Sequence, residues 1–384
     1  MTEDHTDHQA ALVQHLTESG ALRTPGWIEA FGAVARHPFL GGRVFLQDDT
    51  GPYTRWRPVT DDSPVWSELV YQDRALVTQL DGTEAQPEGD EPVTGSPTSS
   101  SSLPTVMALM FEELQAETGQ KVLEIGTGTG WSTALLAARF GEHKVTSVEL
   151  DPVIGRAAAA ALHDYGVRPT LAIGDGLAGY RPTAPFDRII STCSVRTVPP
   201  AWLAQADPAA RIVTPLRGWM QASALLELTV EGDGTARGGF ADFDIGFMFA
   251  RAHTPPPIGV LADPATGHSS PNEIGADLLA GRQDRTGRWI LQLALPGALT
   301  FQLVEGDLTI LVLHDPVTGA TAWVHPDHVI QAGPEDLWAR AQGAVQDWYK
   351  AGSPPLHDFQ VLITSARQVV SHPDMATSFT LPAS

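Results

Sequence analysis

The segment KVLEIGTGTGW, residues 121–131, constrains the fold of this chain more than any other. An apolar run, 122–125, leads into three glycines at alternate positions, and a helical pattern follows over 131–140. The three glycines are Gly126, Gly128 and Gly130. Glycine lets the backbone turn tightly and approach a ligand closely, because it has no β-carbon. The segment therefore predicts a strand, a ligand-binding turn and a helix.

The spacing of the glycines discriminates between ligands. A dinucleotide fingerprint, G-x-G-x-x-G, would place its third glycine at position 131, where this chain has Trp131. The observed G-x-G-x-G is preceded by the acidic Glu124. This combination suits S-adenosylmethionine, whose ammonium group favours a carboxylate and which carries no pyrophosphate.

Two further strand-like runs end in acidic residues. KVTSVELD ends near Glu149, 23 residues after Gly126, where an acid can accept both hydroxyls of a ribose. LAIGDG places Asp175 where its carboxylate or the neighbouring backbone can hold an adenine amino group. The alternative is that strand ends carry acids because they meet solvent. The predicted cofactor site comprises Glu124, Gly126, Thr127, Gly128, Glu149, Leu150, Asp175 and Gly176.

Composition restricts the partners. The formal net charge of −21 argues against nucleic acid, which is bound by clustered Lys and Arg, and against anionic membranes. The single cysteine, Cys193, cannot form an internal disulfide and fits a reducing compartment. The N-terminal residues are polar and acidic, and no run approaches 18 apolar residues. We therefore expect a cytoplasmic protein that binds neither nucleic acid nor membrane.

The chain changes character along its length. The polar segment 83–102 is expected to be a mobile loop, and alternating strands and helices over about 103–252 predict a parallel α/β sheet. After 253–259, three runs are expected to form strands: WILQLALP, LTFQLVEG and LTILVLHDP, with turns at 306–307 and 316–319. PEDLWARAQGAVQDWYKAG predicts a helix. HPDH, 325–328, is interpreted as an exposed turn, and no metal site is expected.

Several motifs together resemble the protein-L-isoaspartate O-methyltransferase family. VLEIGTGTGW, VELD, GDGLAGY, APFDRII and IVTPL follow the order and spacing of that family, and VARHPF and VYQDRALVTQ look like its N-terminal elements. SSSLPTVMALM resembles its T-I-S-Q-P-x-x-V-A-L-M segment, so the match covers about residues 10–252. The resemblance implies a Rossmann-like α/β fold that uses S-adenosylmethionine to methylate carboxylates.

The same resemblance assigns roles to the serine run. It places Ser102 on the serine implicated in catalysis, where it would orient the attacking carboxylate and also cap the helix that begins near Leu103. Ser99, Ser100 and Ser101 would form a wall over the cofactor. A serine-rich linker that ends in a helix cap is the alternative.

The chain also departs from the family. CSVR, 193–196, stands where the family has a small-residue run, and Cys193 is interpreted as a packed residue beside the pocket. Arg251 falls near a threonine position on the substrate side, where it would pair with a substrate carboxylate or form a surface ion pair. About 130 residues follow, although the repair enzymes are expected to end here. This tail resembles homologues that modify ribosomally made peptides together with ATP-grasp ligases, the graspetide pathways.

Three parts are expected: 1–82 as the N-terminal part of the methyltransferase, 83–252 as the cofactor-binding core, and 253–384 as an α+β accessory region that recognises a peptide. The leading hypothesis is methylation of an Asp carboxylate in a cyclised precursor peptide, followed by closure of the ester to an aspartimide. The alternatives are repair of isoaspartyl residues in damaged proteins and a non-catalytic module that binds a cofactor or peptide. The sequence leaves the oligomeric state, the peptide and the modified Asp open.

Overall fold

The computed structural model describes residues 3–50, 53–83, 89, 91–274, 285–305 and 308–383. The chain divides into two compact units: the first contains 1–192 and 204–213, and the second contains 193–203 and 214–384. This division differs from the expected three parts, because 193–203 and 214–252 group with the C-terminal residues. The strand β9 (Ala206–Arg217) contributes to both units.

The first unit begins with helices and a small antiparallel sheet. Its strand order is β2-β1-β3-β4. The elements are α1 (Glu3–Glu18), α2 (Pro25–Ala33), η1 (His37–Phe39), β1 (Arg43–Asp48), β2 (Arg55–Thr60), α3 (Trp66–Val70), β3 (Leu76–Leu80) and β4 (Pro97–Ser101). The expected mobile loop 83–102 is wrong for its last part, because 97–101 is a strand paired with β3. Residues 84–88 and 90 of that loop lie outside the described residues.

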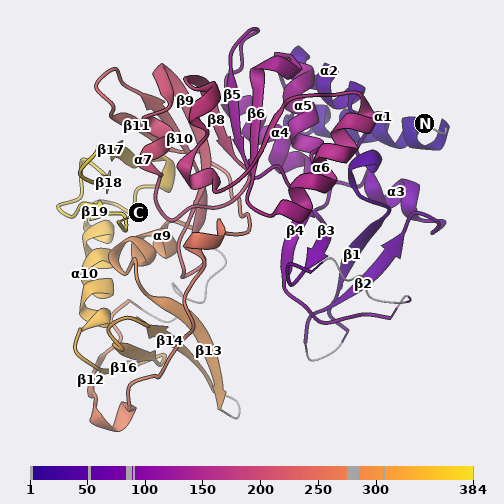
Figure 1. Ribbon diagram of the computed structural model, residues 1–384. Coiled ribbons are helices and arrows are strands. Elements are labelled where there is room, and N and C mark those ends of the chain that lie inside the picture. The colour runs from indigo at the N-terminus through magenta and orange to yellow at the C-terminus, as the bar shows by residue number, and fades with distance from the viewer. Residues whose placement is uncertain are drawn as a thin grey trace. The chain divides into compact units, whose positions relative to one another are not determined.

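A parallel sheet follows and carries the glycine turn. The first unit contributes the order β7-β6-β5-β8 and the first part of β9, all parallel. The strands are β5 (Val122–Ile125), β6 (Val145–Glu149), β7 (Thr170–Ile173) and β8 (Phe186–Ser191). The helices are α4 (Pro104–Glu113), α5 (Trp131–Phe140) and α6 (Pro152–Tyr165), with short turns η2 (Glu142–Lys144), η3 (Gly176–Ala178) and η4 (Arg181–Thr183) (Figure 1). The predicted parallel α/β core is confirmed.

The second unit contains antiparallel strands from distant parts of the chain. From β9 the order is β10 (Ser223–Val230), β11 (Ala236–Phe240), β17 (Gln360–Ile363), β18 (Gln368–Ser371) and β19 (Phe379–Thr380). Strand β17 pairs with β11 over four residue pairs, from Ala236–Ile363 to Gly239–Gln360. The end of the chain is therefore part of the sheet that β11 belongs to, and a cut after residue 252 would remove one of the two strands that pair with β11.

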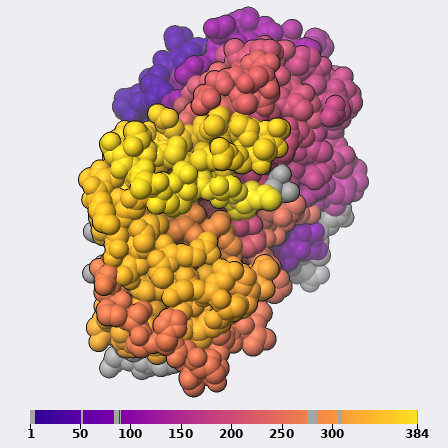
Figure 2. Space-filling model, turned by 90° about the vertical axis from the view of Figure 1, so that its left-hand side faces the viewer, coloured from indigo at the N-terminus to yellow at the C-terminus, as the bar shows by residue number. Residues whose placement is uncertain are grey.

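A separate five-stranded sheet and further helices also belong to this unit. The strand order is β12-β16-β15-β14-β13. The remaining elements are α7 (Pro200–Leu203), η5 (Arg251–His253), η6 (Pro264–Thr266), β12 (His268–Pro271), α9 (Arg285–Ala294), β13 (Leu299–Glu305), β14 (Leu308–His314), β15 (Thr321–Val324), β16 (His328–Ala332), α10 (Leu337–Lys350) and η7 (Leu356–Asp358). In Figure 2 the last residues of the chain, in yellow, lie against the orange residues of this region.

The predictions for this region are confirmed in part. HPDH forms the turn between β15 and β16, where the His325 N–H donates to the His328 carbonyl over 2.9 Å. The helix α10 buries its predicted apolar face and begins at Leu337, where the Asp336 side chain accepts the N–H of Ala339. The predicted strand WILQLALP is wrong, because residues up to Ala294 belong to the helix α9. A short run that is buried on all sides has the same composition in a strand and in a helix. The turn expected at 306–307 lies outside the described residues.

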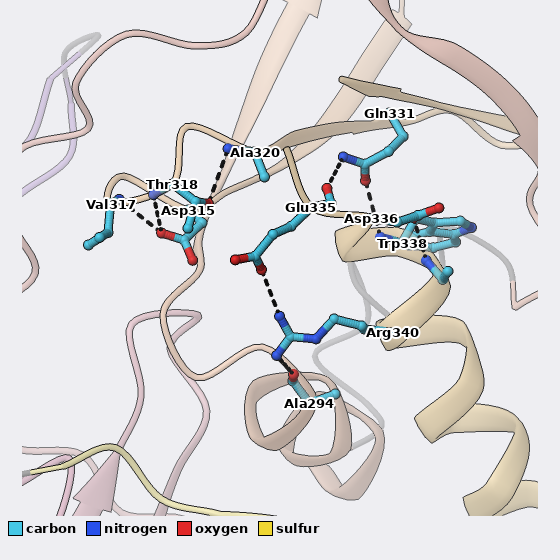
Figure 3. Close-up of polar contacts among 11 residues, drawn as sticks. Ala294, Asp315, Val317, Thr318, Ala320, Gln331, Glu335, Asp336, Trp338 and Arg340 are labelled. Atoms are coloured by element: carbon cyan, nitrogen blue, oxygen red, sulfur yellow. Dashed lines mark hydrogen bonds and ion pairs between the residues drawn. The ribbon is translucent and has the colours of Figure 1, made fainter. Parts of the chain in front are cut away.

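A hydrogen-bond network fixes α9 against α10 (Figure 3). Arg340 of α10 donates to the Glu335 carboxylate over 3.0 Å and to the carbonyl of Ala294, the last residue of α9, over 2.8 Å. The Gln331 amide donates to the Glu335 carbonyl over 2.9 Å. The hydrogen bond from Arg340 to Ala294 joins the first turn of α10 to the last residue of α9, and it holds that end of α9 in position. Of the helices in the described ranges, none combines the length and the apolar character that crossing a bilayer requires.

Candidate active site

The glycine turn has the conformation that its sequence predicts. Gly126, Gly128 and Gly130 have φ values of 94°, 55° and 92°, a region that side chains with a β-carbon rarely adopt. The Gly126 N–H donates to the Val148 carbonyl over 2.9 Å, which ties the start of the turn to β6. A β-carbon on Gly128 would lie 3.7 Å from the Ser100 carbonyl oxygen, so the turn faces the serine strand across a narrow gap.

Glu124 lies at the centre of the parallel sheet and is completely buried. Its Oε2 accepts hydrogen bonds from Thr133 Oγ1 over 2.5 Å and from Ser147 Oγ over 2.7 Å. Its Oε1 meets no donor with hydrogen-bond geometry within the described residues, although the nearby Ser132 hydroxyl lowers the pKa of the carboxyl. Burial raises the pKa of Glu124 from 4.5 to about 7, because a carboxylate loses its hydration there. The protein therefore holds an incompletely satisfied carboxylate directly beneath the glycine turn.

Glu149 ends β6 and binds the turn from the side. Its Oε2 accepts the Gly128 N–H and its Oε1 accepts the Asp151 N–H, each over 2.9 Å. Each carboxylate oxygen has a second lone pair, so both oxygens retain capacity for a further donor such as a ribose hydroxyl. Glu149 is half-buried, and the neighbouring Leu150 leaves 40% of its surface exposed.

The end of β7 is adjacent to the end of β6, since Ile173 is the register partner of Glu149. Asp175 is exposed and accepts the Leu177 N–H over 3.0 Å, which caps η3. Gly176 has a packing reason to be glycine, because a β-carbon there would lie 2.5 Å from the Ile125 side chain. The structure thus brings the ends of β5, β6 and β7 together, as the sequence predicted.

The serine run divides into two faces of β4. Ser99 and Ser101 are buried, whereas Ser100 and Ser102 are half-buried. Ser99 Oγ accepts a hydrogen bond from Thr78 over 3.2 Å, and Ser101 Oγ accepts one from Arg36 Nε over 3.0 Å. Because side chains alternate along a strand, only Ser100 and Ser102 share the other face.

The expected capping role of Ser102 is wrong. The N-cap residue of α4 is Leu103, which makes no side-chain hydrogen bond. The cap comes from Asp73, which accepts the Thr105 N–H over 2.8 Å and the Thr105 hydroxyl over 2.7 Å. Leu103 occupies the N-cap position because Pro104 starts the helix one residue after it, so Ser102 lies just outside the helix.

Arg36 is a structural residue that the sequence did not reveal. It is fully buried, and its guanidinium donates to carbonyls on both sides of α4's entry: to Ser102 over 2.9 Å, to Ser101 over 3.2 Å and to Arg74 over 3.0 Å. Burial lowers the pKa of Arg36 to about 9. A single side chain therefore fixes the backbone that carries Ser102.

Other supporting residues were missed for the same reason. Thr192 donates to the Gly126 carbonyl over 2.5 Å, and the hydroxyls of Thr127 and Ser147 bond over 2.6 Å. The side chain of Thr127 therefore points into the protein. Small hydroxyl residues occur throughout the chain, so composition does not single them out. The only available signal was their position at strand ends.

Arg251 and Cys193 belong to the second unit. Arg251 is exposed at the start of η5. Cys193 is half-buried and is not in a disulfide. The substrate role of Arg251 and the packing role of Cys193 beside the pocket therefore remain predictions.

The fold and the glycine turn define a Rossmann-like, S-adenosylmethionine-dependent methyltransferase. The family model described as "Protein-L-isoaspartate(D-aspartate) O-methyltransferase (PCMT)" matches residues 67–236. A protein-L-isoaspartate O-methyltransferase of Anaeromyxobacter dehalogenans (strain 2CP-1) is 38% identical over 173 residues, 44% of this chain and 81% of that protein. The homologue from strain 2CP-C is 46% identical over 117 residues, 30% of this chain and 55% of that protein.

A solved structure named protein-L-isoaspartate O-methyltransferase has the same fold, with a TM-score of 0.55 and 18% sequence identity. It covers 95% of this chain and 99% of its own. The 173 matched residues make up 81% of the first Anaeromyxobacter protein, so that protein is much shorter than this chain, as expected, whereas the solved structure shares the fold over nearly all of this chain. The chain belongs to the protein-L-isoaspartate O-methyltransferase family. It is accordingly an S-adenosylmethionine-dependent carboxyl O-methyltransferase.

Proposed function

We propose that this enzyme methylates the side-chain carboxylate of an Asp residue in a ribosomally made, cyclised precursor peptide. The observation that carries methyl transfer is the arrangement of a glycine turn and three acidic strand ends on adjacent parallel strands. The choice of peptide rests on the LWARAQ and DWYKAGSPPLHDF segments of the C-terminal region, which resemble peptide-modifying homologues.

The residues present fit the proposed cofactor. Glu124 Oε1 is a buried acceptor without a partner in the described part of the chain, as an ammonium site requires. The gap between Gly128 and the Ser100 carbonyl would be filled by a larger side chain. We assign Glu124 to the ammonium group, Glu149 to the ribose, and Leu150 with the Asp175–Gly176 turn to the adenine. The backbone of Gly126 to Gly128, including Thr127, and Ser100 would enclose the rest, whereas the hydroxyls of Ser99 and Ser101 are occupied by Thr78 and Arg36 on the other face of β4.

When bound, S-adenosylmethionine supplies a methyl group that is already electrophilic, so the attacking carboxylate needs no strong base. The protein's task is alignment and the exclusion of water, and alignment alone can contribute roughly 7–11 kcal/mol. We assign this task to Ser102, whose backbone is fixed by Arg36. Its hydroxyl would donate to one carboxylate oxygen and leave the other oriented for attack.

The product ester accounts for the aspartimide. The backbone nitrogen of the following residue attacks the ester carbonyl, a C–N bond forms, and methoxide leaves and takes up the amide proton as methanol. This ring closure needs no further group from the enzyme. A peptide that is already cyclised holds the nitrogen near the ester.

The test compares two peptides that differ in the linkage of their acidic residue. One is a cyclised peptide with a normal Asp, and the other is a linear peptide with isoaspartate. Mass spectrometry measures the rate of methyl transfer, and we expect this rate to be at least tenfold higher on the cyclised peptide. Ser102→Ala should lower turnover roughly 10- to 1000-fold with cofactor affinity changed only a few-fold. Ser99→Ala is the matched control, because Ser99 is on the opposite face of β4.

Repair of isoaspartyl residues is the second candidate, because both relatives described above carry the name protein-L-isoaspartate O-methyltransferase. Faster methylation of the isoaspartyl peptide would replace the proposed substrate with this one. Binding of S-adenosylmethionine with turnover on neither peptide would instead contradict both peptide assignments.

A further inference from the structure

A pocket of about 290 Å³ lies within the second unit. It is lined by residues from the segment after β8, the end of β9, the helix α9 and the C-terminal residues, among them Arg196, Arg217, Trp289, Gln292 and Leu381. This volume includes space that is open to solvent, so it is an upper bound on what the pocket encloses. The pocket therefore fits a single small group such as a carboxylate and is too small for a nucleotide.

Two arginines in this pocket have no acidic partner. Within the described residues, neither Arg196 nor Arg217 forms an ion pair, although the chain contains 45 acidic and 24 basic residues. The Arg196 guanidinium stacks 3.3 Å from the centroid of the Trp219 ring, and that of Arg217 lies 4.7 Å from the centroid of Phe249. Burial lowers the pKa of both, that of Arg196 to about 10. Two cations are thus partly desolvated without a compensating carboxylate.

Three residues that line the pocket each carry an unsatisfied N–H donor. Arg196 Nε, Arg217 Nε and Trp289 Nε1 are each buried and have no hydrogen-bond partner in the described part of the chain. Trp289 is only 2% exposed. A buried donor without an acceptor costs about 1–3 kcal/mol, so such groups are uncommon in folded proteins. Three of them in one small pocket indicate that a ligand provides the acceptors.

Some of the other donors of the arginines are occupied. Arg196 Nη2 donates to the Pro296 carbonyl, and Arg217 Nη1 donates to the Phe247 carbonyl over 2.8 Å. A guanidinium has five N–H groups, so each arginine offers its unsatisfied Nε–H together with further Nη–H groups. A ligand with two acceptor oxygens and a negative charge matches these donors and the two cations.

We propose that this pocket binds a carboxylate group of an acidic peptide. The carboxylate oxygens accept from the three donors, and Leu216, Leu293 and Leu381 surround the adjoining methylene groups. Only the identity of the peptide rests on the proposed function, because the anion site is defined by its own donors. Arg196 lies in the CSVR segment and Trp289 lies in α9, so the site uses residues at which this chain departs from the family pattern or extends beyond it.

The donors are held in place before any ligand arrives. Gln292, one turn after Trp289, accepts the Met220 N–H over 2.6 Å. The end of α9 is tied to α10 through Arg340 (Figure 3). Little conformational entropy is then lost when the ligand binds, and this favours affinity for small carboxylates.

The experiment observes the tryptophan directly in the full-length protein. The protein is labelled with ¹⁵N at its indole nitrogens, and the Trp289 resonance is assigned with Trp289→Phe. N-acetyl-aspartate amide is the probe, N-acetyl-asparagine amide is its neutral counterpart, and inorganic phosphate is the alternative anion. We expect a saturable shift of the Trp289 resonance with the aspartate probe, with a Kd on the order of millimolar for so small a ligand.

Arg196→Gln and Arg217→Gln should each weaken binding of the aspartate probe at least fivefold. Arg237→Gln is the control, because Arg237 is an exposed arginine in the same unit that pairs with Glu231 over 3.1 Å. It should leave the affinity unchanged. Circular dichroism shows whether each variant is folded, and the comparison of the three probes on the unsubstituted protein does not depend on any variant.

Each opposite result overturns the proposal. Equal shifts with the aspartate and asparagine probes would show that the pocket does not select an anion. Tighter binding of phosphate would make it a phosphate site, and no response of Trp289 would remove the ligand altogether. The measurement uses no S-adenosylmethionine and no turnover, so failure of the proposed methylation would leave its outcome unchanged.

Discussion

Replacing Glu124 with glutamine should stabilise the ligand-free protein above neutral pH. In the folded protein the pKa of Glu124 is about 7, against 4.5 in an exposed chain, because the carboxylate is completely buried and its Oε1 is unsatisfied within the described residues. At roughly 1.4 kcal/mol per tenfold change in proton affinity, the ionised form lowers the stability of the folded protein by about 3 kcal/mol. Glutamine has the same shape and no charge.

The sign follows from proton linkage. Because the folded pKa is raised, the folded protein binds more protons than the unfolded chain between pH 4.5 and about 7. The stabilisation that the protonated Glu124 gives the folded protein is complete below pH 4.5 and is lost as the pH rises through the folded pKa of about 7. Glu124→Gln removes this dependence. We expect it to gain about 1–3 kcal/mol at pH 8, since the unpaired amide N–H cancels part of the effect.

Scanning calorimetry at pH 5 and pH 8 measures the change. The two units can unfold separately, so the relevant transition is the one that shifts when S-adenosylmethionine is added. For a unit of this size, 1–3 kcal/mol corresponds to a Tm increase of roughly 2–12 °C at pH 8. Glu112→Gln is the matched control, because Glu112 Oε1 accepts the N–H groups of Arg23 and Thr24 over 2.7 and 2.8 Å. It should lower the Tm. Identical pH dependence in the Glu124 variant and the wild type would refute the reasoning.

Two further predictions concern the site. Gly128→Val should abolish S-adenosylmethionine binding in titration calorimetry, because a β-branched residue at φ 55° is strained and the gap to the Ser100 carbonyl is narrow; retained affinity would show that the turn does not contact the cofactor. Asp73→Ala should lower the stability of the first unit by about 0.5–2 kcal/mol through loss of the α4 cap. An unchanged Tm would show that another group replaces that cap.

The core of the site could be predicted because it depends on short segments. The run from Val122 to Ile125, the three glycines and the acids at 149 and 175 are contiguous or nearly contiguous motifs, and the structure places them as expected. Their local conformation follows from residue type, since glycine permits positive φ and apolar runs form buried strands. Family resemblance then accounted for the order and spacing of the motifs along the chain.

The parts that could not be predicted depend on long-range contacts. Asp73 caps a helix that starts more than thirty residues later, and Arg36 reaches Ser102 across 66 positions. The helical conformation of WILQLALP could not be predicted, because nearly all of its residues are buried and the run therefore lacks the periodicity that separates a helix from a strand. The pairing of β17 with β11 likewise joins residues more than 120 positions apart. No local pattern records such contacts.

The two units place different physical demands on their residues, and this separates their functions. In the first unit the proposed cofactor site consists of backbone groups, hydroxyls and carboxylates, and methyl transfer from a sulfonium requires no cation from the protein. In the second unit the pocket has two arginines, a tryptophan N–H and, in the residues described, no carboxylate partner. Substitutions at Arg196 or Arg217 should therefore raise KM for an acidic peptide and leave S-adenosylmethionine affinity unchanged. Substitutions at Gly128 should lower S-adenosylmethionine affinity and leave KM for the peptide unchanged. A cross-effect in either direction would show that the two sites are energetically coupled, in which case peptide selection and methyl transfer are not separate properties of this chain.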